Sequence, residues 1–524
     1  MAVKSSLIAI TMLARSGATA LAWQRFEAGG FATDDPAALA VRGRLLKDRA
    51  RAAVGAEARA LFAESAAAYA RAAAIDGTTY PLINAATLTL LGGDAEGAAR
   101  LAGQVLERLA NGAPDRETPY YRGATHAEAL LLLGRRAEGE AALVAAIALA
   151  PAASEDHATT LRQFALIHRE TGADDAWLNA YRAARTLHFT GRMASPLAPA
   201  AQAALAGDIT GILATARIGT AYGALAAGAD LVIAEALVAN GVALHVVLPT
   251  NISAFLDVSV VPAGAAWRSR FETILAAAAS IDTGTALGVD APAIALAGER
   301  AMGRAIQTAD RLATSAHQLI ITGPAGAAGI NTGRDAALWH ATGRPQHVLH
   351  WPEPIAASSV AAPAGDRLTA LIEVGLDADA GLDGLSDIAA ALAALPAPLA
   401  IAATPAGARL AWTDPAVAAH AAMAILAAIH PTRAPHIAGH YAVTPAAPDP
   451  FTGKLALFGD EVARTARLAA LAPPGALYAS EDFLAGLVLR SPDFRHEYVG
   501  DAPGERNGAD LPLHAIGRRG ALPG

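Results

Sequence analysis

The feature that most constrains the fold is a change in sequence pattern near residue 185. Residues 1 to about 180 contain almost no strand signal and alternate Ala- and Leu-rich segments with short breaks. From "ARTLHFTGRM" (184–193) onward, short apolar runs alternate with helical segments. Both patterns must be satisfied in one chain of 524 residues, which is long enough for about two to four domains.

The first region has the spacing of a helical-pair solenoid. Small residues at repeat positions, as in "AEGAARLAGQVLERLA" (95–110), let neighbouring helices approach closely. We therefore predict an α-solenoid over residues 1–180, with helices in antiparallel pairs: 36–54 with 57–75, 80–92 with 94–109, and 120–134 with 136–149.

The remainder divides into two α/β regions. Residues 184–352 alternate apolar strands with helices, which predicts a doubly wound parallel sheet of the Rossmann-like kind. Loops at the carboxyl ends of such strands are the usual ligand site. A linker rich in Ala, Pro and Ser follows at 353–365, and residues 366–518 then predict a mixed α/β domain.

Composition narrows the classes of function. The formal net charge of −8 gives no electrostatic reason to expect nucleic acid or an anionic membrane as a partner. The absence of cysteine excludes disulfides, thiolate metal sites and a cysteine nucleophile. The stretch "SSLIAITMLA" (5–14) is short for a secretory signal, so we interpret it as a core helix. We expect a soluble, cytoplasmic protein without a membrane span.

The third region resembles the class III adenylate/guanylate cyclase homology domain. The resemblance rests on "PHIAGHYAVTPAAPDPFTGKLALFGDEVARTARLAALAPPGALYASEDFLAGL" (435–487), which follows the family's D-P-x-T-G loop, G-x-x-V-N-x-A-x-R helix and P-P-G strand in order. The resemblance implies a ferredoxin-like α/β fold of the cyclase type. It also implies assembly as a homodimer or a heterodimer through this domain.

This region differs from the family at the positions that bind the metal ions and stabilise the transition state. Near the first metal-binding aspartate the sequence offers only Glu373, with Asp377 shifted, and Gly407 replaces the second. Ala463 replaces the amide that steadies the transition state, whereas Arg467 is kept. Cyclisation needs two metal ions held by carboxylates, and one lost donor commonly costs ~10²–10³ in rate. The sequence therefore favours an inactive pseudo-cyclase, with Mg²⁺ or Mn²⁺ as cofactor only if the site is active.

The middle region resembles the SLOG superfamily of Rossmann-like proteins. The matching stretches are "FTGRM" (189–193), "AYGALAAGADLVIAEALVANGVALHVVLP" (221–249) and "GPAGAAGINTGRDAALWHATGRP" (323–345). The resemblance implies that a nucleotide-derived ligand meets a glycine loop opening a helix. For Asp230 a capping role, and for Glu235 a solvated helix position, are open alternatives. The residues implied to line the pocket are Gly191, Arg192, Gly223, Gly228, Asp230, Glu235, Gly329, Asn331, Thr332 and Arg334.

The first region resembles the tetratricopeptide-like domain of the TRAF-binding region of certain kinases and of bacterial signalling proteins. "RGRLLKDRAR" (42–51), "TTYPLINAATLTLLGGD" (78–94) and "ATHAEALLLLG" (124–134) carry the resemblance. We interpret Asn84 and a Lys47–Asp48 ion pair as structural. The order of the three regions resembles a bacterial signalling architecture, which implies a sensor that binds a protein partner through its repeats. An active, divergent cyclase making cyclic AMP or GMP and a non-enzymatic scaffold remain as alternatives.

Overall fold

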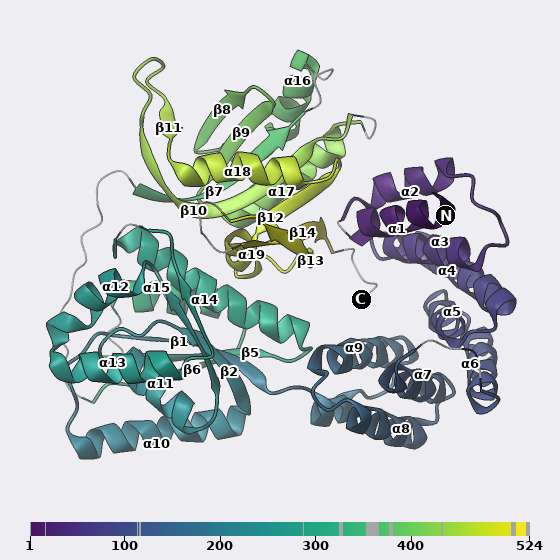
Figure 1. Ribbon diagram of the computed structural model, residues 1–524, viewed down its shortest axis with the longest axis horizontal. Helices are drawn as coiled ribbons and strands as arrows, with labels where there is room; N and C mark the ends of the chain where they lie inside the picture. The colour runs from purple at the N-terminus through teal and green to yellow at the C-terminus, as the bar shows by residue number, and fades with distance from the viewer. Residues whose placement is uncertain are drawn as a thin grey trace. The chain divides into compact units, whose positions relative to one another are not determined.

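The computed structural model of the chain describes residues 2–15, 17–112, 114, 117–286, 288–323, 329–352, 366–376, 381–430, 433–504 and 510–519. One compact unit extends to Ala183, and a second spans Ala184–Ile516 (Figure 1). The expected linker at 353–365 and Asp377 lie outside the described residues.

Up to Ala183, the described residues of the first unit form helices joined by short loops. Side-chain caps begin several helices: Asp35 accepts from the amide of Ala37, and Asp94 from that of Gly97. The expected pairs correspond to α3 with α4, α5 with α6 and α7 with α8. The helices are α1 (Ala2–Arg15), α2 (Thr19–Ala28), α3 (Pro36–Ala50), α4 (Gly55–Asp76), α5 (Thr79–Leu91), α6 (Ala95–Ala110), α7 (Pro119–Leu132), α8 (Arg136–Leu149) and α9 (Ser154–Thr171), followed by the 3-10 helix η1 (Ala176–Tyr181).

Small residues set the spacing between these helices. A methyl group at Gly43 of α3 would lie 2.7 Å from the ring of Tyr69 on α4. Ser65 of α4 also donates a hydrogen bond to the Gly43 carbonyl at 2.6 Å. The backbone of α3 therefore lies directly against α4, which explains the high alanine and glycine content of this unit.

A parallel sheet opens the second unit, in the order β4-β3-β2-β1-β5-β6. Helices cover both of its faces, as a doubly wound sheet requires. Its strands are β1 (Arg185–Gly191), β2 (Ile218–Gly223), β3 (Ala243–Leu248), β4 (Ser280–Thr283), β5 (Ala316–Thr322) and β6 (Gln346–His350). Its helices are α10 (Pro199–Ala216), α11 (Ala229–Ala239), α12 (Ile252–Ser259), η2 (Val261–Ala263), α13 (Ala265–Ala277), α14 (Ala291–Arg311) and α15 (Ile330–Ala341).

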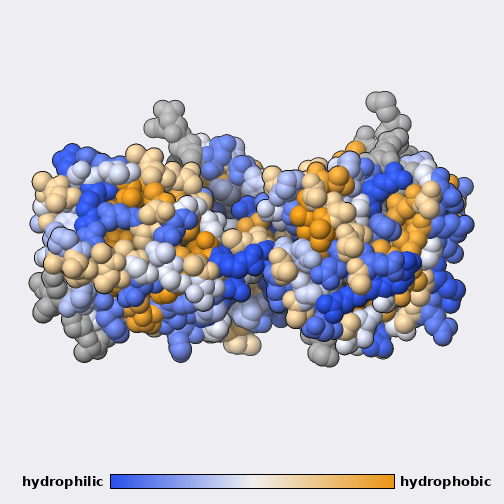
Figure 2. Space-filling model, turned by 90° about the horizontal axis from the view of Figure 1, so that it is seen from below, coloured by the Kyte–Doolittle hydropathy of each residue, from blue (hydrophilic) through white to orange (hydrophobic). Residues whose placement is uncertain are grey.

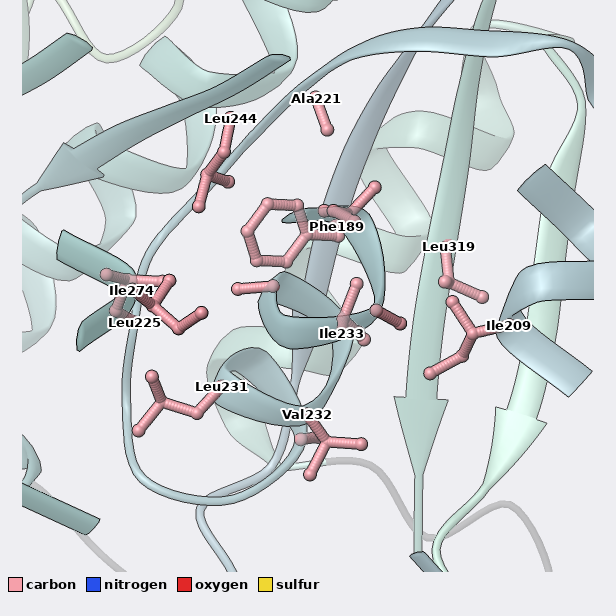
Figure 3. Packing of buried hydrophobic residues seen from close by; sticks show 14 of the residues in the cluster. Phe189, Ile209, Ala221, Leu225, Leu231, Val232, Ile233, Leu244, Ile274 and Leu319 are labelled. Carbon is pink, nitrogen blue, oxygen red and sulfur yellow. The ribbon is translucent and has the colours of Figure 1, made fainter. Parts of the chain in front are cut away.

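Alternating side chains of β1 divide between the two faces of this sheet. Phe189 is buried in the cluster that α10, α11 and α13 make, where it lies beside Leu244 and Ile233 (Figure 3). His188 points to the opposite face and stacks on Trp339 of α15. Both faces are therefore packed, and ligand access is left to the ends of the strands.

The second sheet runs β13-β14-β12-β10-β7-β9-β8, and β11 pairs with β10. The order β10-β7-β9-β8 with antiparallel neighbours is the ferredoxin-like arrangement of a β-α-β-β-α-β unit. Its elements are β7 (Asp366–Gly375), α16 (Gly381–Leu392), β8 (Ala400–Thr404), β9 (Gly407–Trp412), α17 (Pro415–Ala428), β10 (His436–Pro448), β11 (Leu455–Leu457), α18 (Asp460–Leu471), β12 (Ala476–Ser480), α19 (Glu481–Val488), β13 (Phe494–Ala502) and β14 (Leu511–Arg518).

Helix α14 is buried on two sides. Met302 and Ile306 pack against the parallel sheet through Tyr222 and Val247. Leu296 packs instead on the core of the ferredoxin-like part, and Gly303 meets Ala485 of α19. The two α/β parts therefore share one helix.

Hydrophobic residues on the face displayed in Figure 2 form separate groups bordered by hydrophilic ones. Every helix among the described residues is too short or too polar to cross a bilayer.

Candidate functional site

The parallel sheet reverses its strand order between β1 and β5, and this is where open α/β sheets bind ligands. Gly191 ends β1 there, and Arg192 follows it. The hydroxyl of Thr332, in the first turn of α15, donates to the Gly191 carbonyl at 3.0 Å. The amide of Ala229, which opens α11, donates to the Arg192 carbonyl at 3.1 Å. The amino ends of two helices and one arginine therefore meet at the switch point.

Most of the glycines expected here are required by packing. A methyl group at Gly191 would lie 2.2 Å from the Ala229 Cβ, and one at Gly223 would lie 2.6 Å from the Phe189 carbonyl oxygen. Gly228 has a φ of 115° and lies against backbone atoms. Gly329 differs, because a methyl group there would lie 3.9 Å from the Arg192 side chain. Gly329, the residue that precedes α15, is thus the expected glycine that faces the arginine.

Two buried carboxyls support this corner. Asp230 is 6% exposed and accepts from the Ala226 amide at 3.3 Å, and burial raises its pKa to about 8. Burial also raises the pKa of Asp335 to about 6, although the neighbouring Arg334 opposes that shift. Arg334 pairs with Asp335 at 2.6 Å and donates to the Ala295 carbonyl of α14 at 2.7 Å. These groups hold α11, α15 and α14 in position.

The structure brings most of the expected residues together but leaves Glu235 apart. Glu235 receives two hydrogen bonds from Arg270 of α13, at 2.5 and 2.7 Å, and that arginine stacks on Trp267. Asn331 lies in the first turn of α15, next to Thr332. Burial lowers the pKa of His188 to about 3, so this histidine is a neutral core residue.

The positions that match the cyclase site have other partners. Glu373 of β7 faces Arg409 of β9 and accepts its hydrogen bond at 2.7 Å. Burial raises the pKa of Glu373, and Arg409 opposes the shift. Gly407 has a φ of 150°, and a methyl group there would lie 2.2 Å from the Val374 carbonyl oxygen, so this backbone has no room for an aspartate.

Carboxylates that could hold metal ions are sparse around these positions, and Asp377 lies outside the described residues. Within those ranges, no group of three or more His, Asp or Glu side chains could hold a metal ion. Ala463 and Arg467 lie on α18, which packs on β7 and β10.

An ionic cluster joins the two α/β parts around α14. Arg300 pairs with Asp282 at 2.5 Å and with Asp482 of α19 at 2.7 Å. Arg304 pairs with Asp282 and, at 2.6 Å, with Glu481. Sequence reasoning missed this cluster, because its partners lie up to about 180 residues apart and carry no local motif.

A second ionic contact of α14 lies beside this cluster. Glu299 is 3% exposed and receives two hydrogen bonds from Arg490, at 2.7 and 3.0 Å. Thr285, in the segment before α14, also donates to Glu461 of α18 at 2.9 Å. The ferredoxin-like part is thus held at several points of one helix and its approach.

A cavity in the repeats was also not predicted from the sequence. It lies between α3, α4, α5 and α9 and contains Lys47 and Asn84. Asp48 pairs with Arg44 and Arg51, each at 3.8 Å, rather than with Lys47. Asn84 donates to the Tyr80 carbonyl within its own helix. The sequence feature that could have pointed to this cavity is the rarity of lysine, because the chain has only Lys4, Lys47 and Lys454.

Comparisons with known proteins cover parts of the chain. Residues 7–89 match a family model described as Tetratricopeptide Repeats-Sensor. No curated protein matches the chain. An adenylate cyclase of Trypanosoma brucei, solved in its monomeric state, aligns over 30% of this chain and 91% of its own, with 10% identity and a TM-score of 0.26. An adenylate/guanylate cyclase/hydrolase of Silicibacter pomeroyi aligns over 29% of this chain and 98% of its own, with 18% identity and a TM-score of 0.24. The N-terminal repeats are thus similar to sensor repeats, and these solved structures are cyclases.

Proposed function

We propose that this chain is a signalling protein that senses a nucleotide or a nucleotide-derived ligand at the switch point of its parallel sheet. The observation that carries the proposal is the meeting of the α11 and α15 amino ends with Arg192 beside Gly329. Helix amino ends attract anions through their unpaired amides and their dipole. An arginine adds a planar donor that suits phosphate.

The relay of the signal begins at Arg334. This residue ties α15, whose first turn borders the site, to the Ala295 carbonyl of α14. Helix α14 in turn carries the arginines that pair with α19. A ligand that shifts α15 therefore acts directly on the helix shared by both α/β parts.

The ferredoxin-like part acts in this proposal as a pseudo-cyclase that passes the signal on. The ion pair of Glu373 with Arg409 and the lack of room at Gly407 support this role. The part associates with a second copy or with an intact cyclase domain, and the repeats dock a protein partner. Because nucleotides are found mainly inside cells, the proposal places the protein in the cytoplasm.

The test is a thermal-shift panel on the full-length chain with ATP, GTP, cyclic nucleotides and ADP-ribose. A ligand at 100 times its dissociation constant should add about 2.7 kcal/mol of stability. Arg192→Ala should remove the shift, whereas Arg268→Ala, which removes an exposed arginine of α13, should retain it. Stabilisation by none of these ligands, or equal stabilisation of the Arg192→Ala protein, would overturn the proposal.

The enzyme alternative is tested separately. The chain, alone and mixed with an intact cyclase domain, is incubated with ATP or GTP and Mn²⁺, and cyclic product is measured. We expect none from the chain alone. Product that disappears in a folded Glu373→Ala variant would instead identify an active, divergent cyclase.

A further inference from the structure

The cavity in the repeats is enclosed by helices that are distant in sequence. The end of α3, the start of α4 and the length of α5 form one side, and α9 closes the other. Its volume is about 90 Å³, below the ~300–1,000 Å³ of sites that enclose a whole drug-sized ligand. The cavity therefore has room for an anionic group, while the rest of a ligand would lie at its mouth. Phe62, Leu88, Leu91 and Leu166 give it an apolar wall.

Positive charge dominates the rest of the lining. Lys47, Arg51, Arg59 and Arg169 all border the cavity, against the single carboxylate of Glu170. Arg51 has a partner in Asp48 at 3.8 Å. Within the described ranges, no carboxylate lies at ion-pair distance from Lys47, Arg59 or Arg169.

Two polar residues that line the cavity, Thr87 and Gln163, are held by hydrogen bonds to a carboxylate behind them. Thr87 of α5 and Gln163 of α9 both donate to the Glu128 carboxylate of α7, at 2.5 and 3.0 Å. One oxygen of Glu128 therefore holds together two helices that line the cavity. Glu128 acts on Lys47 electrostatically from behind these residues, but within the described ranges it forms no ion pair with a cation of the rim.

Lys47 is the cation in the most costly position. Its pKa is lowered from 10.5 to about 8, chiefly by burial and also by the charges of Arg51 and Arg44, while Asp48 and Glu128 oppose this shift. A half-buried ammonium without a close partner is destabilising. An anion bound at this point would relieve that cost.

We propose that this cavity binds a small organic anion, with one phosphate, sulfonate or carboxylate group on a flat apolar body. The anionic group pairs with Lys47, Arg59 and Arg169, and the body lies on Phe62 and the leucines. The small volume of the cavity favours a small molecule over a peptide. This site goes beyond the proposed function, which gives the repeats only a protein partner.

The probe is 8-anilinonaphthalene-1-sulfonate, which has such a body, and its neutral counterpart is N-phenyl-1-naphthylamine. Fluorescence titration of the full-length chain should give at least tenfold tighter binding of the anionic dye. Lys47→Met, which keeps the apolar stem, should weaken it by about tenfold, and Arg59→Ala at the exposed rim should do the same. Arg42→Ala removes a cation from the same helix outside the cavity and should change binding less than twofold.

A second readout follows Lys47 itself. Reductive ¹³C-methylation labels only three lysines and the amino terminus, so an NMR pH titration can follow Lys47 with Lys454 as the internal control. Dye binding should move the Lys47 signal and raise its midpoint above about 8, while Lys454 stays unchanged. Equal affinity for both dyes, unchanged affinity in Lys47→Met and Arg59→Ala, or an unmoved Lys47 signal would overturn the proposal.

Competition distinguishes the possible occupants. Adenosine 5′-monophosphate should displace the dye and adenosine should not. Displacement by an acidic peptide alone would replace the small anion by a peptide partner. Arg192→Ala should leave dye binding intact, so failure at this cavity and failure at the switch point can be told apart.

Discussion

Gly303→Ala should loosen the contact that joins the two α/β parts. Gly303 lies on α14, and a methyl group there would lie 2.4 Å from both the Cα and the Cβ of Ala485 on α19. Carbon atoms in contact prefer about 3.5 Å or more, so the helices would have to separate by about 1 Å. Backbone atoms block the methyl group, and no side chain can rotate away from it.

The magnitude follows from two opposing terms. Alanine in a helix gains about 1 kcal/mol over glycine, while overpacking of a well-packed contact costs about 1–3 kcal/mol. Separation also stretches the ion pairs of Arg300 and Arg304 with α19. We expect a net loss of up to about 2 kcal/mol. Gly207→Ala on α10, where nothing lies within 4 Å of the new methyl group, should instead gain up to about 1 kcal/mol.

The assay is urea unfolding of the full-length chain, followed by circular dichroism and by tryptophan fluorescence. Gly303→Ala should lower the midpoint of the second unit, and Gly207→Ala should raise it or leave it unchanged. If the two variants move the midpoint in the same direction by the same amount, the close approach of α14 and α19 is not the determining contact and the reasoning fails.

Three other perturbations have expected outcomes. Arg490→Ala leaves the buried Glu299 carboxylate without its ion-pair partner and should lower the free energy of unfolding in urea by about 3–5 kcal/mol. The exposed Arg268→Ala should lower it by less than about 1 kcal/mol. Equal losses in the two variants would contradict this expectation. Burial alone raises the pKa of Glu461, but the hydrogen bond and charge of its neighbouring histidine, with an arginine, hold it at about 2. Because this folded pKa is depressed from 4.5, unfolding free energy should fall as the pH drops from about 4.5 to 2, and Glu461→Gln should flatten that slope in acid titrations. Since the pKa of Lys47 is lowered from 10.5 to about 8, the folded chain binds fewer protons there, so stability should rise between pH 8 and 10.5 and Lys47→Met should remove this rise.

The sequence pattern correctly predicted helices and strands that depend on neighbouring residues in the chain. The paired helices follow from apolar spacing and from caps such as Asp94, and they coincide with α3 to α8 within a few residues. The apolar strands of the parallel sheet were equally visible. The expected ligand residues at the ends of β1 and before α15 meet at the switch point because parallel strands end at one edge.

Long-range contacts could not be predicted in this way. Strand β4 is short and mostly exposed, so it has no apolar run. The partner of Glu235 is 35 residues away on another helix. The cavity depends on how far the repeats curve before α9 reaches the level of Lys47, and that curvature is a sum of small angles between helices.

The double burial of α14 has a consequence for how such a chain can be recombined in evolution. A domain that is held by a linker can be exchanged for another without change to its neighbour. Here the face of α14 that meets α19 carries Gly303, Arg300 and Arg304, and each suits this one partner. We expect the two α/β parts to be inherited as one module, whereas the repeats, which form their own compact unit, are free to be replaced.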